Sequence, residues 1–321
     1  MLEILDGGVS TTVQDLGRFG QYHIGMPPSG AMDSYAHKLA NYLVGNAEDA
    51  ATLEMTYQGV DVRFTTDTVV ALTGASMPAT LDDEPVPMYE SFSVTAGQTL
   101  ETEFATEGVR TYLSVSGGID VDPVMGSRST YTLVGIGGHE GRPLKAGDEL
   151  RIGNDSDRPP VGTQVPDRYV RDYGTRETVR VLVGLCEYRL TDESREALSA
   201  AEWKVTPEAD RVGYRLEGPE LDFVKREQPF GAGNDPSNVV DLGYPIGSIQ
   251  MPKKPIVLLQ DAVTGGGYAT VGTVISVDRS LLAQRRTHQS VYFEPVTVDE
   301  AAAARDEVHD DLHGAYESIG R

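Results

Sequence analysis

Short runs of β-branched and aromatic residues, bounded by Gly, Pro or Asp, dominate the hydrophobic pattern of this chain. Runs at 69–72, 111–115, 179–183, 256–259 and 290–293 predict strands. Residues 96–100 (AGQTL) and 146–150 (AGDEL) resemble each other, and both predict a tight turn that leads into a strand. Such turns are common in closed β-barrels. We therefore expect a mainly β protein, of the β-rich α+β class.

Helical periodicity is confined to a few segments. Asp33 suits the N-cap of a helix whose apolar positions 36, 39, 40 and 43 share one face and which stops at Gly45. A second helix is predicted over 191–201. Residues 299–316 predict a C-terminal helix with a narrow apolar stripe, which indicates a docked or fraying helix rather than a coiled coil.

A Pro-, Gly- and Asp-rich stretch interrupts the strand pattern at 154–177 and predicts a linker. The expected organisation is a first β-rich domain over 1–153, this linker, a second β-barrel domain over 178–296, and an acidic C-terminal helix or tail over 297–321. A chain of 321 residues is comfortable for two domains.

The charge balance limits the classes of molecule that this chain can bind. The formal net charge is -22, and lysine is scarce, with 6 Lys against 21 Arg. Duplex nucleic acid is excluded as a partner, because binding phosphates needs a clustered positive surface. Acidic runs that recruit a basic partner remain one explanation. The acidic excess is spread along the chain, which favours a surface adapted to high salt, where the Debye length falls to roughly 3 Å. A halophilic source is therefore expected.

Other features place the chain in the cytoplasm. No window approaches eighteen uninterrupted apolar residues, so no membrane span is expected. The first residues lack the basic and apolar regions of a secretory leader. The single cysteine, Cys186, cannot form an internal disulfide and follows an apolar run, which favours a small core residue over a nucleophile.

Residues 11–33 carry the densest candidate chemistry. Gln14, Asp15 and Arg18 stand among glycines that permit positive φ, and Ser29 lies in a Pro-Pro-Ser-Gly turn that leads to Asp33. An amide, a carboxylate and a guanidinium in such a loop suit a substrate site. The alternative is a surface loop in which Asp15 pairs with Arg18. For Asp33, the N-cap role is favoured over proton transfer.

A second candidate lies at 261–268. The three glycines Gly265, Gly266 and Gly267 offer backbone N–H groups that suit an oxyanion or phosphate, or they form a turn between two strands. Asp261 either faces this loop or caps a strand. Arg128 in a Gly-Ser-Arg-Ser run either binds a carboxylate or pairs with an acid. The sequence carries no convincing metal motif, catalytic triad or Gly-x-x-x-x-Gly-Lys loop.

These segments resemble a known family. The stretch 11–33, GGI at 117–119, GSRST at 126–130, DRVGYRL at 210–216, GSIQMP at 247–252 and DAVTGGGY at 261–268 match, in order, motifs of the carboxyltransferase-like family. That family includes KipA, the C subunit of 5-oxoprolinase and the carboxyltransferase part of urea amidolyase. The resemblance implies two linked β-barrel-like domains, one of them cyclophilin-like.

The resemblance also implies a function. The first expectation is a C-subunit-like component of an ATP-dependent 5-oxoprolinase, inactive alone. It would open 5-oxo-L-proline to L-glutamate with two partners, a KipI-like B subunit together with a larger A subunit. ATP would act through the complex. The alternatives are a biotin-dependent carboxyltransferase component of a urea amidolyase-like system and a non-catalytic KipA-like regulator that binds a KipI-like protein. The sequence has no Met-Lys-Met biotin-carrier segment.

Site residues follow from the same motifs. Catalytic roles are expected for Asp15, Arg18 and Asp261, and no metal ligand is expected. Substrate binding is expected for Gln14, Ser29, Asp33, Arg128, Gln250, Thr264, Gly265, Gly266, Gly267 and Tyr268. The chain departs from the family at Val263, where Gln is usual, and at Gly265, where Thr is usual. It also has Lys253-Lys254 where the family usually has Asp-Gly between two prolines.

Overall fold

The computed structural model describes residues 1–154 and 160–320, and these fall into two compact units. Unit 1 comprises Met1–Arg18, Ser29–Tyr173 and His309–Arg321, and unit 2 comprises Phe19–Pro28 and Gly174–Val308. Each unit is therefore assembled from separate stretches of the chain. The predicted linker over 154–177 includes residues 155–159, which lie outside the described residues.

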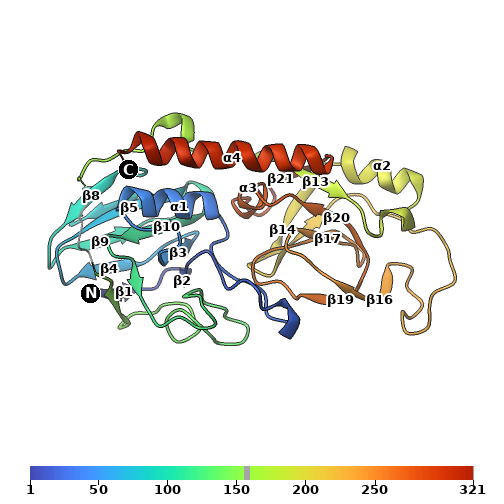
Figure 1. The fold of residues 1–321 in the computed structure, drawn as a ribbon, viewed down its shortest axis with the longest axis horizontal. Helices are drawn as coiled ribbons and strands as arrows, with labels where there is room; N and C mark the ends of the chain where they lie inside the picture. Colours follow the sequence, from blue (N-terminus) through green and yellow to red (C-terminus); the bar gives the residue numbers. More distant parts are fainter. Residues whose placement is uncertain (155–159, 321) are drawn as a thin grey trace. The chain divides into compact units, whose positions relative to one another are not determined.

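Unit 1 is built from two antiparallel sheets (Figure 1). The larger sheet has the strand order β11-β12-β1-β4-β9-β6-β7, with bounds Ile119–Asp120, Glu149–Ile152, Leu2–Asp6, Asp61–Phe64, Thr99–Thr102, Ala79–Leu81 and Glu84–Pro85. The smaller has the order β2-β3-β10-β5-β8, with bounds Ser10–Gln14, Thr52–Thr56, Glu107–Val115, Thr68–Ser76 and Ser91–Val94. The turns predicted at 96–100 and 146–150 lead into β9 and β12, and each contains a glycine with positive φ.

Apolar residues from both sheets form one continuous core in unit 1. Leu2 and Val62 from the larger sheet and Leu53, Leu72 and Leu113 from the smaller one belong to the same buried cluster. Because alternate residues of a strand face opposite sides, the residues next to Leu113 face away from this core. One of these neighbours is Tyr112, which packs with helix α1 (Ser34–Leu43). The smaller sheet thus has an apolar face and a second face covered by a helix.

Helix α1 forms as its sequence predicts. The Asp33 carboxylate accepts a hydrogen bond from the Ala36 N–H, and Gly45 after the helix has a positive φ of 75°. The helix is buried along most of its length. Its contact with the sheet is partly polar, since the Thr73 hydroxyl donates a 2.7 Å hydrogen bond to the Ala36 carbonyl.

Unit 2 is built around a closed barrel (Figure 1). Its strand order is β13-β20-β17-β18-β15-β14-β21, with bounds Arg176–Val183, Thr270–Val274, Ser248–Gln250, Ile256–Leu258, Gly213–Glu217, Trp203–Ala209 and Ser290–Pro295. Pairing is antiparallel except between β13 and β21, which run parallel. Trp203 is fully buried, and its ring lies 6.2 Å from that of Phe293. The mainly β prediction is confirmed.

A two-stranded ribbon in unit 2 contains the three glycines for which the sequence left open a ligand loop or a turn. Strand β16 (Asn238–Gly243) pairs antiparallel with β19 (Gly265–Tyr268), so residues 265–267 lie in a strand rather than in a turn. Neither a turn nor a loop forms here. Glycine-rich strands are hard to recognise locally, because they form where a partner strand supplies the hydrogen bonds. The binding of a ligand by these N–H groups stays a prediction.

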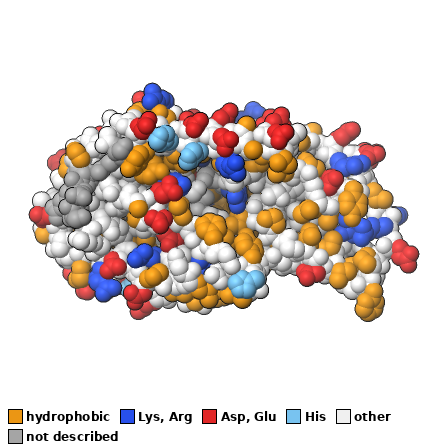
Figure 2. All heavy atoms as spheres, in the orientation of Figure 1, with side chains coloured by type: hydrophobic (Ala, Val, Ile, Leu, Met, Phe, Trp, Pro, Cys, Tyr) orange, Lys and Arg blue, Asp and Glu red, His pale blue; other side chains and the backbone are white. Residues whose placement is uncertain are grey.

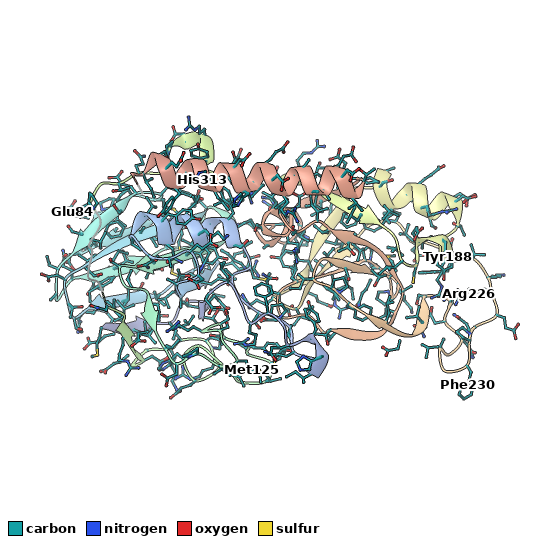
Figure 3. All side chains as sticks on the ribbon, viewed as in Figure 1. Glu84, Met125, Tyr188, Arg226, Phe230 and His313 are labelled. Atoms are coloured by element: carbon teal, nitrogen blue, oxygen red, sulfur yellow. The ribbon has the colours of Figure 1, made fainter. Side chains whose placement is uncertain are left out.

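The remaining described elements are helical. They are α2 (Asp192–Ala200), α3 (Arg279–Ala283), α4 (Val298–Ser318) and the short 3-10 turns Tyr22–Ile24, Asp167–Tyr169 and Glu187–Arg189. Helix α4 contributes Val298–Val308 to unit 2 and its remaining residues to unit 1. Acidic side chains gather along it (Figure 2). In its unit 1 part, the exposed His313 has its Nε2 3.3 Å from the Glu317 carboxylate (Figure 3). The described residues contain no helix long and apolar enough to span a membrane.

Candidate functional site

The Asp15 carboxylate, directly after strand β2, is the centre of the candidate site in unit 1. It is only 8% exposed. It accepts hydrogen bonds from the backbone N–H of Gly17 at 2.8 Å and of Arg128 at 2.5 Å, and from the hydroxyls of Ser127 at 2.6 Å and Ser129. The donors from 127–129 thus join two segments more than a hundred residues apart in the chain. Asp15 and Arg18 are both buried, which contradicts the alternative of an exposed surface loop.

These contacts decide the protonation state of Asp15. Burial raises its pKa, but the hydrogen bonds from the two serines and from two backbone N–H groups lower it more, so that the pKa lies below its ordinary value. The carboxylate is ionised and already holds four donors. This arrangement suits a group that fixes the shape of a loop better than a general base.

Arg18 is buried against the same loop. Its guanidinium donates a hydrogen bond to the Ser129 carbonyl. Gly137, with a φ of +70°, approaches both groups so closely that a Cβ there would lie 2.1 Å from the Ser129 carbonyl oxygen and 2.6 Å from an Arg18 nitrogen. Only glycine fits at this position. Arg18 therefore holds together the segments at 127–130 and 135–141.

Gln14 and Ser29 present buried polar atoms beside this loop. The Gln14 side-chain amide donates to the Thr12 hydroxyl at 2.9 Å and to the Thr130 carbonyl at 3.2 Å. Within the described residues, Gln14 Oε1 and Ser29 Oγ have no hydrogen-bond partner although both side chains are fully buried. The hydrogen bond from Ala31 N–H to the Asp15 carbonyl, 2.8 Å, brings the segment at 29–31 next to Asp15. Unsatisfied buried polar atoms are rare and suit a ligand.

Asp33 has a mainly structural set of contacts. Besides capping α1, its carboxylate accepts a 2.8 Å hydrogen bond from the Tyr173 hydroxyl, and its N–H donates to the Tyr112 oxygen at 2.7 Å. The Tyr112 hydroxyl in turn donates to the buried Glu54 at 2.7 Å. Burial, with added repulsion from neighbouring carboxylates, raises the pKa of both tyrosines well above the usual range.

The sequence reasoning missed this buried polar network and also missed His37. His37 is fully buried in α1, its Nδ1 lies 3.0 Å from the Thr52 hydroxyl, and burial lowers its pKa to about 4. The imidazole is therefore neutral at physiological pH. The only available signal was its place on the apolar face of a predicted helix.

A cavity of about 700 Å³ lies in unit 1 on one side of the glycine-rich segment at 135–141. Arg128 supports its wall, because its Nε donates a 2.9 Å hydrogen bond to the carbonyl of Val121, a lining residue. Its charged lining consists of Asp120, Asp122, His139, Glu140, Glu149 and Arg151. Four carboxylates in this set disfavour an anionic ligand.

In unit 2, Asp261 is paired with a residue that the site prediction did not name. The carboxylate, 1% exposed, forms a bidentate ion pair with Arg211, with distances of 2.8 Å and 3.1 Å. The Asp261 N–H also donates to the Arg211 carbonyl at 2.9 Å. Arg211 belongs to the DRVGYRL motif, so the signal was present in the sequence. This pair joins two motifs fifty residues apart.

The structure brings a part of the 11–33 segment to the second candidate motif. Residues 19–28 belong to unit 2, and a Cβ built on Gly25 would lie 3.8 Å from Thr264 Oγ1. Beyond Thr264, the Tyr268 N–H donates to the Tyr244 hydroxyl at 2.7 Å, and that hydroxyl donates to the Tyr268 carbonyl at 3.0 Å. Val263, at a position where the chain departs from the family, is half-exposed.

Gln250 is buried in β17 opposite Thr270 of β20. Gln14, Asp15, Arg18, Ser29, Asp33 and Arg128 thus lie in unit 1, and Gln250, Asp261 and residues 264–268 lie in unit 2. Among the residues that the structure describes, no group of three or more His, Cys, Asp or Glu side chains is arranged to hold a metal ion.

Comparison with known proteins identifies relatives along almost the whole chain. Residues 24–295 match the family model for the carboxyltransferase domain, subdomain A and B. The 5-oxoprolinase C subunit of Escherichia coli is 39% identical over 95% of this chain and 94% of its own length. That of Haemophilus influenzae is 35% identical over the same shares. Urea amidolyase of Saccharomyces cerevisiae is 32% identical over 95% of this chain, which spans only 17% of that protein.

Solved structures give the same picture. The urea carboxylase of Kluyveromyces lactis superimposes with a TM-score of 0.93 at 32% identity, covering 98% of this chain and 29% of that one. The urea amidolyase of K. lactis gives a TM-score of 0.92 at 31% identity, covering 98% of this chain and 20% of that one.

Proposed function

Because this chain belongs to the family of the carboxyltransferase domain, subdomain A and B, we propose that it is the C-subunit-like component of an ATP-dependent 5-oxoprolinase. The observation that carries the proposal is the extent of the match to the E. coli protein, which covers nearly all of both chains. The urea amidolyases match at lower identity and over a small part of their length. The proposed reaction opens the lactam of 5-oxo-L-proline to give L-glutamate.

The chemistry explains why a complex is proposed. A lactam carbonyl is a poor electrophile, so its opening is coupled to ATP. The sequence contains no Gly-x-x-x-x-Gly-Lys loop, so nucleotide binding is assigned to the assembly with a KipI-like B subunit together with a larger A subunit. This chain would contribute substrate positioning and stabilisation of the charge that develops on oxygen.

The contacts of Asp15 suggest how the site residues divide this work. Asp15 and Arg18 hold the loop, and the buried atoms Gln14 Oε1 and Ser29 Oγ, which have no hydrogen-bond partner among the described residues, are the groups that we assign to ligand binding. The Gln14 amide oxygen can accept a hydrogen bond from a lactam N–H. The Ser29 hydroxyl can either donate to the lactam carbonyl or accept from the lactam N–H. Asp261 has the same proposed role in unit 2, because it holds the 210–216 motif in place by its ion pair with Arg211. For Asp15, Arg18 and Asp261, for which the sequence predicts catalytic roles, we propose roles in positioning.

Reconstitution tests the proposal. The purified chain with ATP is expected not to convert 5-oxo-L-proline, whereas the chain with its B-like and A-like partners should release L-glutamate. Ser29→Ala removes only a hydroxyl without a partner, and we expect kcat/KM of the complex to fall about tenfold. Ser93→Ala changes an exposed serine of the same unit and serves as the control. Turnover by the isolated chain, or an unaffected Ser29→Ala complex, contradicts the proposal.

The fold similarity to urea carboxylase favours one alternative, a biotin-dependent carboxyltransferase. That activity needs a biotinylated carrier from another protein. It predicts carboxyl transfer to urea in the presence of a carrier and no release of L-glutamate from 5-oxo-L-proline. A KipA-like regulator would bind a KipI-like protein and show neither reaction, so the same two assays separate the three functions.

A further inference from the structure

The face of the smaller sheet that is turned towards α1 carries a row of polar side chains. The row consists of Thr12, Glu54, Tyr112 and Thr73, which lie directly opposite one another on the adjacent strands β2, β3, β10 and β5. Directly opposite residues of antiparallel strands share a face. All four side chains are buried, and α1 lies against β5 and β10 (Figure 1). Because buried polar groups are almost always hydrogen-bonded, the partners of this polar row show what it holds in place.

Two consecutive backbone N–H groups are bound by the middle of the polar row. The Met32 N–H donates to Glu54 Oε2 at 2.8 Å. The Asp33 N–H donates to the Tyr112 oxygen at 2.7 Å, and the Tyr112 hydroxyl donates to the same Glu54 oxygen, also at 2.7 Å. Burial raises the pKa of Tyr112 well above its usual range, so the hydroxyl stays protonated and keeps this direction. Glu54 and Tyr112 therefore fix the backbone at 32–33.

The segment directly before these two residues is held in an uncommon conformation. Ser29 and Gly30 both have positive φ, 56° and 90°. A positive φ is rare for serine and persists only where the surroundings enforce it. A Cβ at Gly30 would lie 2.7 Å from the backbone carbon of Leu16, so the chain here is in close contact with the Asp15 loop. Ser29 is thus fixed by this contact on one side and by the anchored residues 31–33 on the other.

Gln14 is held by the end of the same row. Its Nε2 donates to the Thr12 hydroxyl oxygen at 2.9 Å, and the two residues share one side of β2 because they are two positions apart. Together with the bond from Nε2 to the Thr130 carbonyl, this contact sets which way the amide group is turned. The two atoms that we assign to ligand binding, Gln14 Oε1 and Ser29 Oγ, therefore both depend on the polar row for their place.

We propose that Glu54 and Tyr112 are positioning residues for the Ser29 hydroxyl. They touch no ligand themselves. They hold residues 32–33, and through them they keep Ser29 in the conformation in which its hydroxyl meets the lactam. This role rests on the proposed function, which assigns Ser29 to the lactam. A hydroxyl that is already oriented does not have to be ordered when the substrate binds, and it can stabilise charge that develops during the reaction.

A double-mutant cycle in the reconstituted complex tests this role, with kcat/KM for 5-oxo-L-proline as the readout. Tyr112→Phe removes the oxygen that accepts the Asp33 N–H, and kcat/KM should fall by about threefold to tenfold. Because Tyr112 acts through Ser29, adding Tyr112→Phe to Ser29→Ala should cause no further fall. Losses that add up in the double variant, or an unchanged kcat/KM in Tyr112→Phe alone, overturn the role.

Thr73→Val is the matched control. Thr73 is the cross-strand partner of Tyr112, and its buried hydroxyl donates to the Ala36 carbonyl of α1 rather than to the segment at 29–33. Thr73→Val should lower the thermal midpoint, as Tyr112→Phe should, but leave kcat/KM unchanged. If both variants lose kcat/KM to the same extent, the effect is one of general stability and the positioning role is contradicted.

Two variants of Glu54 keep the test decisive if Tyr112→Phe does not fold. Glu54→Gln and Glu54→Met both remove the negative charge 3.9 Å from Arg110 Nε, so both should lower the thermal midpoint. Only glutamine keeps an oxygen that accepts from the Met32 N–H and the Tyr112 hydroxyl. We expect Glu54→Gln to retain kcat/KM within about twofold. Glu54→Met should lower it, and only when Ser29 is present. Equal kcat/KM in the two variants contradicts positioning by hydrogen bonds.

Turnover of the unaltered complex keeps this role apart from the proposed function. If the complete complex releases no L-glutamate, the proposed function is overturned, and the positioning role with it. If turnover depends on Ser29 but on neither Tyr112 nor Glu54, the positioning role alone is overturned and the proposed function stands.

Discussion

Replacing Asp15 by asparagine tests whether the carboxylate holds the unit 1 loop. Three donors converge on Oδ1, from Gly17, Ser127 and Ser129, and the Arg128 N–H reaches Oδ2. An asparagine keeps one carbonyl oxygen. In its best orientation it serves the three donors as a neutral acceptor and turns its NH₂ group towards the Arg128 N–H.

The cost follows from these contacts. The bond to Arg128 is lost and leaves a buried donor unsatisfied, at about 1–3 kcal/mol, and three charge-assisted bonds weaken to neutral ones. The sum is about 3–5 kcal/mol of unfolding free energy, similar to that of breaking a buried ion pair. Asp49→Asn, at an exposed position of the same unit, should change stability by less than about 0.5 kcal/mol.

Urea unfolding at fixed molar salt measures the difference, followed by circular dichroism and by fluorescence. The single tryptophan, Trp203, reports on unit 2, so two coincident transitions mean that the units unfold together. The folded-state pKa of Asp15 is lowered from 3.8, so its stabilisation is present above that pH and is lost as pH falls through the folded value. The gap between the original chain and Asp15→Asn should therefore narrow below about pH 4. A variant as stable as Asp49→Asn refutes the reasoning.

Three further expectations follow from the structure. Asp261→Asn should destabilise unit 2 by about 3–5 kcal/mol, because it removes the charge of a buried carboxylate that binds Arg211 at two points. Unfolding followed by Trp203 fluorescence measures this loss, and an unchanged transition would contradict the prediction. Raising potassium chloride from about 10 mM to about 1 M should raise the thermal midpoint, as screening shortens the range of repulsion from roughly 30 Å to 3 Å; a flat midpoint would argue against salt adaptation. Gly314→Ala should lower the thermal midpoint, because the alanine Cβ would lie 2.3 Å from the Tyr169 hydroxyl. This clash outweighs the higher helix propensity of alanine, about 1 kcal/mol. Tyr169→Phe in the same chain should restore part of the lost stability.

The local sequence pattern predicted the helices and strands of this fold better than it predicted how the strands pair. The strands, the N-cap at Asp33 and the C-terminal helix follow from residue type and spacing within ten or twenty residues. The glycine strand β19 does not, since its pairing with β16 depends on a segment some twenty residues away.

The candidate site shows the same limit. The motifs identified Asp15 and Asp261 as candidate site carboxylates. They did not identify the residues that bind these carboxylates. Ser127 and Ser129 reach Asp15 across more than a hundred residues, and Arg211 reaches Asp261 across fifty. In the folded chain, the oxygens of both carboxylates already bind protein groups, which the motifs alone could not show. The catalytic assignments remain predictions until variants are assayed.

The division of the chain between the units has a consequence during synthesis on the ribosome. Unit 1 contains Met1–Arg18 and also His309–Arg321, which is synthesised after every residue of unit 2. In that final segment, the Tyr316 ring packs 5.0 Å from Tyr42 of α1, and Gly314 lies against Tyr169. Unit 1 is therefore completed only after all of unit 2 has been synthesised, and until then this side of α1 is uncovered. A nascent chain that stalls before residue 309 exposes that surface to chaperones and proteases.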